Sequence, residues 1–232
     1  MRARQLALRF ERQEEYCYGN YYPGTNAFAI AQLQRPDIER IYLWGPLGSG
    51  KTHLLQAVCQ QADARQQPVI YLPLTTLAAY PPTATEGLES CDIICLDDLQ
   101  AIVGNPAWEE ALYTLFNLFE GQLILTGPVP SAELGLRLPD LRSRLAGSLS
   151  LALHPLGEAE RVEALQWRAH WRGFDLPKES ARYLLSHSTR EAVFSLLDNL
   201  AQASLSAKRR ITIPFIKTAL ELPPRVISGV GC

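Results

Sequence analysis

Short apolar runs alternate with amphipathic segments over the first part of the chain. The runs are three or four residues long, too short for buried helices and typical of strands covered on both faces; they lie at 41–44, 69–72, 93–96 and 123–125. Helices are expected between them, at 26–34, from residue 53 onward, and at 108–120, where apolar side chains recur at helical spacing. Strands that alternate with helices predict a parallel sheet with right-handed crossovers.

The pattern changes after Pro155, where only helical periodicity remains. Helices are expected there at 157–172, 177–187, 190–206 and 213–221. Near the N-terminus, apolar and polar residues alternate instead, which is extended periodicity. The sequence therefore predicts four regions: a flexible segment at 1–20, an α/β domain with a parallel sheet core flanked by helices at 21–155, a small all-α domain at 156–222 and a disordered tail at 223–232.

The composition narrows the class of protein. Of 232 residues, 47% are hydrophobic and 20% charged, which suits a soluble globular protein with a substantial core. The net charge of −2 argues against a strongly basic nucleic-acid surface. Since no apolar run could span a bilayer and no apolar signal segment follows Met1, we expect a cytoplasmic protein without membrane contact. The five cysteines form no Cys-x-x-Cys pair, which favours reduced thiols over a zinc site.

A glycine-rich loop after the first predicted strand carries the clearest chemical signal. Residues 45–52 fit the phosphate-binding pattern G-x-x-x-x-G-K-[ST]. The glycines let backbone N–H groups turn towards phosphate oxygens, and the helix N-terminus behind the loop adds positive potential. We expect the Lys51 ammonium to reach the β- and γ-phosphates and the Thr52 hydroxyl to bind Mg²⁺. The residues expected to contact nucleotide here are Gly45, Pro46, Gly48, Ser49, Gly50, Lys51, Thr52 and His53.

Two acidic residues, Asp97 and Asp98, follow the third predicted strand. A carboxylate at this place holds Mg²⁺ in P-loop proteins, and we assign that role to Asp97. Asp98 stands where many ATPases of this kind have a glutamate that polarises the attacking water, and its shorter side chain positions water less well. A chance glycine turn and two acids at a strand end are the alternative, but strand, spacing and loop all agree on a nucleotide site.

Four further stretches resemble the AAA+ family of the bacterial replication initiator DnaA. They are Tyr-Leu-Trp-Gly at 42–45, Leu-Pro-Asp-Leu-Arg-Ser-Arg-Leu at 138–145, Arg-Gly-Phe-Asp-Leu-Pro at 172–177 and Ile-Thr-Ile-Pro-Phe-Ile-Lys at 211–217. The resemblance extends over 5–222 and is closer to the regulatory inactivators of DnaA, the Hda family. It implies an AAA+ P-loop core with a small helical lid that binds ADP or ATP with Mg²⁺. We expect no counterpart of the initiator's helix-turn-helix domain after the lid, since few residues follow Leu222.

The resemblance also implies roles for single residues. Arg144 matches the arginine finger, which in the family reaches the γ-phosphate of ATP bound by DnaA. An ordinary surface arginine is the alternative, and Arg142 is a nearby rival for the same role. Arg190 matches the lid arginine that senses nucleotide phosphates. A salt bridge on the helix surface is the alternative role for this residue. The family's segment around the adenine is matched by Tyr22, Gly24 and Asn26, for which a plain turn is an equal alternative.

Residues 5–10 are similar to the hexapeptide Q-L-x-L-x-[LF] with which inactivators bind the sliding clamp, the β subunit of DNA polymerase III. Gln5 would hydrogen-bond at the rim of a pocket, while Leu8 and Phe10 would fill its apolar interior. Leu6 completes the motif. An edge strand of the sheet is the alternative.

The implied function is negative regulation of replication initiation: the clamp-bound, nucleotide-loaded protein stimulates hydrolysis of DnaA-bound ATP and leaves inactive ADP–DnaA. A stand-alone AAA+ ATPase or helicase loader is the alternative. Two residues argue against a stand-alone ATPase: Asp98, and Pro128, where relatives often have an aspartate. The intact phosphate loop still allows weak intrinsic hydrolysis. The basic run at 208–210 could bind DNA, but positive charges that stabilise the C-terminal end of a helix explain it better. We therefore expect no sequence-specific DNA contact. Family members self-associate, which allows a homo-oligomer.

Overall fold

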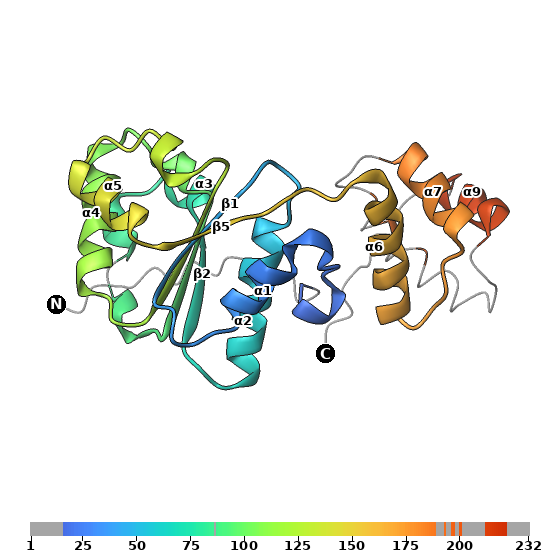
Figure 1. The fold of residues 1–232 in the computed structure, drawn as a ribbon, viewed down its shortest axis with the longest axis horizontal. Coiled ribbons are helices and arrows are strands. Elements are labelled where there is room, and N and C mark those ends of the chain that lie inside the picture. The colour runs from blue at the N-terminus through green and yellow to red at the C-terminus, as the bar shows by residue number, and fades with distance from the viewer. Residues whose placement is uncertain are drawn as a thin grey trace, which may run out of the picture. The chain divides into compact units, whose positions relative to one another are not determined.

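The computed structural model describes residues 16–85, 87–188, 193, 196, 197, 200 and 212–221. The predicted clamp motif at 5–10, Arg190, the basic run at 208–210 and the tail at 223–232 lie outside these described residues, as does most of the helix expected at 190–206. The chain forms two compact units, with the division between Pro155 and Leu156 (Figure 1).

The first unit is built on a five-stranded sheet in which each pair of neighbours is parallel. The strands lie in the order β2-β3-β4-β1-β5, and their bounds are β1 Arg40–Trp44, β2 Val69–Pro73, β3 Ile93–Asp97, β4 Gln122–Gly127 and β5 Leu149–Ala152. The four predicted strands are confirmed; β5 is an addition, because a four-residue strand with only two large apolar side chains gives little periodicity. The parallel sheet predicted from the sequence is thus the fold of this unit.

Helices cover both faces of the sheet. Figure 1 shows α1 and α2 on one side, and α3, α4 and α5 on the other; their bounds are α1 Ala27–Leu33, α2 Lys51–Ala64, α3 Leu74–Leu77, α4 Pro106–Leu118 and α5 Pro139–Ala146. Successive side chains of β1 enter different cores: Ile41 and Leu43 pack with α2, whereas Tyr42 packs with α4 and α5. Burial on both faces explains why this strand has a continuous apolar run rather than an alternating one.

Short 3-10 helices occupy several connections between these elements. They are η1 Tyr18–Asn20, η2 Gly24–Asn26, η3 Pro82–Thr85, η4 Leu88–Ser90, η5 Leu99–Ala101 and η6 Ser131–Glu133. Because parallel strands all end at the same edge, the residues that follow β1, β3 and β4 come together there. That edge brings the loop after Trp44 close to Asp97 and to Thr126 on β4.

The second unit is helical, with α6 (Glu158–Trp171), α7 (Lys178–His187) and α9 (Ile213–Glu221). Its core is apolar and includes Val162, Leu165, Leu184, Leu197 and Ile216. The helix α6 begins after Gly157, whose N–H donates to the Glu160 carboxylate at 2.8 Å and so satisfies a free donor at the helix start. Among the described residues of the two units, no helix is both long and apolar enough to cross a membrane.

Candidate functional site

The loop between β1 and α2 has a backbone that only glycine adopts readily. Gly48 and Gly50 have φ values of 77° and 94°, in the region where a Cβ atom is strained. At Gly45 the limit is space, since an added Cβ would lie 2.3 Å from the Leu153 carbonyl oxygen. The Ser49 hydroxyl is buried and has no hydrogen-bond partner among the described residues. These features suit a loop that wraps closely around a ligand with oxygen atoms.

Lys51, the first residue of α2, lies within the loop that it follows. Its ammonium donates to the carbonyl oxygens of Gly45 at 2.7 Å and Pro46 at 3.1 Å. Burial lowers the pKa of Lys51, while the charges of Asp98 and Asp97 act in the opposite direction. A cation is therefore placed inside the loop, with two carboxylates that favour its charged form.

Asp97 is the centre of a buried hydrogen-bond network. Its Oδ2 accepts from the Thr52 hydroxyl at 2.7 Å and from the Tyr71 hydroxyl at 2.8 Å, and its Oδ1 accepts from the Thr126 hydroxyl at 2.5 Å. The donors come from α2, β2 and β4, so the network joins three elements around the end of β3. Hydroxyl and carboxylate oxygens are the ligands that Mg²⁺ prefers. The structure thus brings together Thr52 and Asp97, the pair expected to hold the metal.

Tyr71 and Thr126 are site residues that the sequence did not reveal. Thr126 lies two positions before Pro128, in the segment where the resemblance places a polar sensor residue, and that position was the available signal. Tyr71 gave no signal, because a tyrosine in an apolar run is typical of a strand core.

Asp98 differs from Asp97 in both backbone and surroundings. Its φ of 62° and ψ of 58° are left-handed, which is uncommon for a residue with a side chain. The Asp98 N–H donates to the Thr126 hydroxyl at 2.9 Å, and its carboxylate accepts from the Gln100 side chain at 2.9 Å. The carboxylate of Asp98 is therefore already engaged with a neighbour on η5.

The segment before α1 contacts the loop through Tyr21. The Tyr21 hydroxyl donates to the Ser49 carbonyl oxygen at 3.2 Å, and its ring lies 2.6 Å from the position of a Cβ on Gly50. The ring of His53 stands edge-on to Tyr21, with the centroids 5.1 Å apart, and is stacked on Tyr16 at 4.6 Å. His53 thus faces residues 16–21, and two tyrosines not singled out in the sequence flank it.

Three other residues of this segment were matched to the family's adenine region. Asn26 is buried, and its amide donates to the His154 carbonyl oxygen at 2.9 Å and accepts from the His154 N–H at 2.8 Å. It also donates to the Tyr21 hydroxyl at 3.2 Å. Gly24 has a φ of 44°, and Tyr22 is half-buried. Asn26 therefore fixes the segment to the chain after β5, while the adenine contact stays a prediction.

Arg144 lies on α5 at the other edge of the sheet from the phosphate loop. Arg144 is in the last turn of α5, shortly before Leu149, which pairs with Ile41 at the start of β1. Burial lowers the pKa of Arg40, the first residue of β1; the charge of Glu39 raises it and the charge of Arg144 lowers it. The loop begins at Gly45, five positions after Arg40 along β1, a distance of roughly 16 Å at the usual rise per residue. Both Arg144 and the neighbouring Arg142 are exposed. Arg144 therefore does not take part in the site around Asp97.

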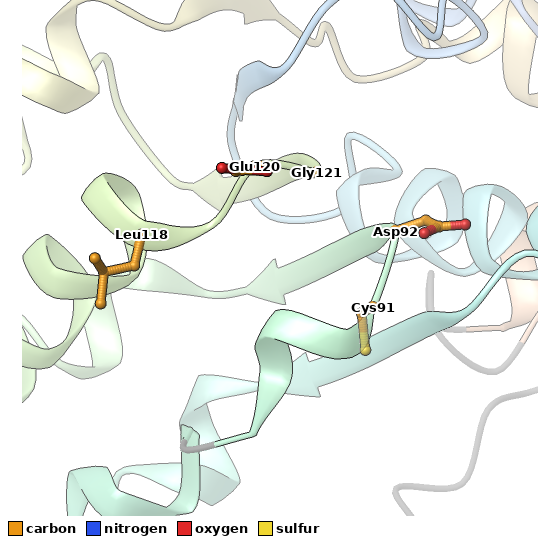
Figure 2. Close-up of a pocket in the computed structure, with 5 residues that line it drawn as sticks. All are labelled: Cys91, Asp92, Leu118, Glu120 and Gly121. Atoms are coloured by element: carbon orange, nitrogen blue, oxygen red, sulfur yellow. The ribbon is translucent and has the colours of Figure 1, made fainter.

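The hollow drawn in Figure 2 lies beside the amino-terminal ends of β3 and β4. It has a volume of about 470 Å³ and is lined by Cys91, Asp92, Leu118, Glu120 and Gly121. The residues come from the chain just before β3, from the last residue of α4 and from the turn between α4 and β4. None of them was expected at a site, and none belongs to the Asp97 network. In the part of the chain that the structure describes, His, Cys, Asp and Glu side chains form no group of three or more that could hold a metal.

The fold and the Asp97 site together define a P-loop protein of the AAA+ class, with a helical lid after the sheet unit. Residues 158–220 match the family model of the Hda lid domain. Domain III of the replication initiation protein DnaA from Thermotoga maritima has the same fold, with a TM-score of 0.70, 19% identity and coverage of 91% of this chain and 98% of that one. The second unit of the chain thus matches the Hda lid model, and the chain has the AAA+ fold that it shares with DnaA domain III.

Two further solved structures share the fold. DnaA from Aquifex aeolicus, solved with AMPPCP bound, has a TM-score of 0.66 and 23% identity, and the match covers 84% of this chain and 67% of that one. RuvB from Thermotoga maritima has a TM-score of 0.59 and 22% identity, with coverage of 86% and 67%. At such identities the likeness is one of fold, so the ligands and partners of this chain have to be argued from its own residues.

Proposed function

We propose that this protein binds ADP or ATP and acts as a negative regulator of replication initiation by stimulating hydrolysis of the ATP bound to DnaA. The observation that carries the proposal is the placement of Arg144, exposed and at the opposite edge of the sheet from the chain's own phosphate loop. An arginine so placed can act on a nucleotide only when another chain holds that nucleotide. The match of residues 158–220 to the Hda lid supports the choice of DnaA as that chain.

The nucleotide site would be formed by the phosphate loop and the Asp97 network. Backbone N–H groups of the loop and the Lys51 ammonium would bind the phosphates. Thr52 and Asp97 would hold Mg²⁺, which neutralises phosphate charge when bound. The buried Ser49 hydroxyl gives the ligand one further partner. AMPPCP bound to the Aquifex aeolicus DnaA, which shares this fold, supports an adenine nucleotide.

Slow intrinsic hydrolysis fits the surroundings of Asp98. Its carboxylate accepts from Gln100, its backbone is left-handed, and its N–H donates to the Thr126 hydroxyl. Pro128, after β4, has no polar side chain to offer a phosphate. The nucleotide would then serve as a resident ligand, while the chain's own arginine acts on a partner.

The chemical role of Arg144 is charge stabilisation. Phosphoryl transfer spreads negative charge over the oxygens of the γ-phosphate, and a guanidinium placed there lowers the barrier. A finger supplied by another chain is worth roughly 10³ to 10⁵ in rate. Residues 5–10 would bind the sliding clamp and so concentrate the protein where the clamp is loaded.

The decisive experiment measures hydrolysis of DnaA-bound ATP with and without this protein, in the presence of clamp loaded on DNA. Stimulation that depends on the clamp is expected, and Arg144→Ala should remove it while nucleotide and clamp binding persist. Arg142→Ala is the matched control, because Arg142 is exposed on the same helix; it should keep most of the stimulation. Full stimulation by the Arg144 variant would rule out the finger assignment.

A stand-alone ATPase is the second candidate, because the Lys51, Thr52 and Asp97 set is intact. The same preparations decide between the two. If the purified protein hydrolyses ATP rapidly and has no effect on DnaA-bound ATP, the stand-alone ATPase becomes the supported function and the regulator is rejected.

A further inference from the structure

The Tyr71 hydroxyl reaches Asp97 from the neighbouring strand. Tyr71 lies on β2 opposite Cys95, two residues before Asp97 on β3, and its side chain extends along the sheet to the carboxylate. Only 8% of Tyr71 is exposed, so its ring is fixed by the core and its hydroxyl has little freedom. The donor to Asp97 is therefore built into the sheet rather than supplied by a surface side chain.

Gln56 on α2 lies beside this hydroxyl. Its side chain is buried. Burial and the charge of Asp97 raise the pKa of the phenol, and a hydrogen bond with the Gln56 side chain lowers it. The phenol donates its proton to Oδ2 of Asp97 at 2.8 Å.

We propose that Tyr71 is a positioning residue that holds Asp97 in the orientation needed to bind Mg²⁺ together with the nucleotide. The proposal rests on the nucleotide site proposed above, but on neither DnaA nor the clamp. Its consequence is that Tyr71 sets how strongly magnesium tightens nucleotide binding.

The reason lies in how the three hydroxyls share the carboxylate. Thr52 is itself an expected ligand of the metal, and its hydroxyl oxygen can bind Mg²⁺ while its proton still points at Oδ2. Thr126 holds Oδ1, so Tyr71 is the donor on Oδ2 that does not also have to bind the metal. The terminal torsion of an aspartate is broad when nothing restrains it. Without Tyr71, Oδ2 would be held only by the Thr52 hydroxyl, which also has to bind the metal.

The test compares Tyr71→Phe with the unchanged protein by calorimetric titration of ADP, once with excess Mg²⁺ and once with excess EDTA. The variant keeps the ring and its packing and removes one oxygen. In EDTA the affinity should stay within about twofold, because the phosphate loop is untouched. With Mg²⁺ it should fall about 10-fold, as expected for one lost hydrogen bond to a charged group.

Tyr42→Phe is the matched control. Tyr42 is also a buried strand tyrosine whose hydroxyl has one protein acceptor, the Val129 carbonyl oxygen at 2.7 Å, but it does not contact Asp97. Its affinities should stay within about twofold under both conditions. If Tyr71→Phe does not fold, as judged by circular dichroism and melting temperature, Gln56→Met carries the test, with a loss of about threefold confined to Mg²⁺.

Two results would overturn the proposal. One is an unchanged effect of Mg²⁺ in Tyr71→Phe, and the other is an equal loss with Mg²⁺ and with EDTA, which would mean a general structural role. If the wild-type protein binds no nucleotide, both the proposed nucleotide site and the role of Tyr71 are rejected. If the expected magnesium effect is seen but the protein does not stimulate hydrolysis of DnaA-bound ATP, the role of Tyr71 stands and the proposed regulatory function is rejected.

Discussion

At the residue scale, the loop glycines and the side chains packed on them have to be considered together. Gly50 is left-handed, and the Tyr21 ring occupies the space where its side chain would be. Tyr21 in turn donates to the Ser49 carbonyl oxygen and accepts from Asn26. The conformation of the loop therefore depends on residues more than twenty positions earlier in the chain.

Replacing Gly50 by alanine should weaken ADP binding about 10-fold or more, because the new Cβ is strained and meets the Tyr21 ring. Gly173→Ala provides the control: its φ is also positive, at 84°, but no atom lies within 4 Å of the added Cβ. That variant should lose about 1 kcal/mol of stability from backbone strain and keep its ADP affinity. Titration calorimetry and thermal melting measure both effects, and equal losses of affinity would contradict the role of Tyr21.

The sequence predicts the residues of the phosphate loop and of the β3 end better than their surroundings. Gly45 to Thr52 and Asp97 belong to local patterns that can be seen along the chain. Tyr71 and Thr126 contact Asp97 across 26 and 29 positions, and their roles depend on which strands are neighbours. Strand order is decided by packing of the whole sheet, so an isolated tyrosine or threonine in an apolar run gave no indication of it.

At the scale of elements, a buried carboxylate connects α4 to the start of α5. Glu109 is only 1% exposed and accepts from the N–H groups of Gly104, Arg137 and Leu138 at 2.8, 2.8 and 2.7 Å. These three groups belong to the loop before α4 and to the chain that leads into α5. Glu109 therefore fixes the beginning of the helix that carries Arg144.

Glu109→Gln should lower the free energy of unfolding by about 2–4 kcal/mol, because an amide nitrogen replaces one acceptor and leaves buried N–H groups unmatched. Stimulation of DnaA-bound ATP hydrolysis should fall further than ADP affinity, since α5 lies away from the phosphate loop. Glu110→Gln is the matched control, being exposed at the next position of α4. Chemical unfolding and the hydrolysis assay check the two parts; equal behaviour of the two variants would refute the assignment.

Element types were predicted well where the apolar run was continuous or the helical spacing was clear. The runs at 41–44, 69–72 and 93–96 became β1, β2 and β3, and the helical spacing at 108–120 became α4. The strand β5 was missed because its pairing with β1, from Ile41 to Trp44, and not its own four residues, makes it a strand. Short elements of this kind depend on tertiary contacts that no local window contains.

At the scale of the whole molecule, buried tyrosines make the stability depend on alkaline pH. Burial raises the pKa of Tyr21 to about 12 and also raises the pKa values of Tyr18, Tyr42 and Tyr71. An unfolded chain ionises its phenols near pH 10, whereas the folded protein keeps these four neutral. Above about pH 10 the unfolded state therefore binds fewer protons, and the free energy of unfolding falls as pH rises.

Each such phenol should contribute about 1.4 kcal/mol per pH unit in this range. For Tyr21 the range runs from about pH 10 to about pH 12. Urea unfolding at about pH 9 and about pH 11 should show the decrease in the free energy of unfolding. In Tyr21→Phe this decrease should be smaller by the contribution of one phenol. An unchanged slope in that variant would show that Tyr21 titrates normally.

The two sheet edges differ in what they offer: the carboxyl edge holds the phosphate loop and the amino edge holds Arg144. A contact in which the arginine of one chain meets the loop of another therefore has a direction. Such heterologous contacts extend into rows unless the rotation between neighbours closes a ring. An open row of chains joined in this way has unlike ends, one with an unused arginine and the other with a nucleotide site that no neighbour touches.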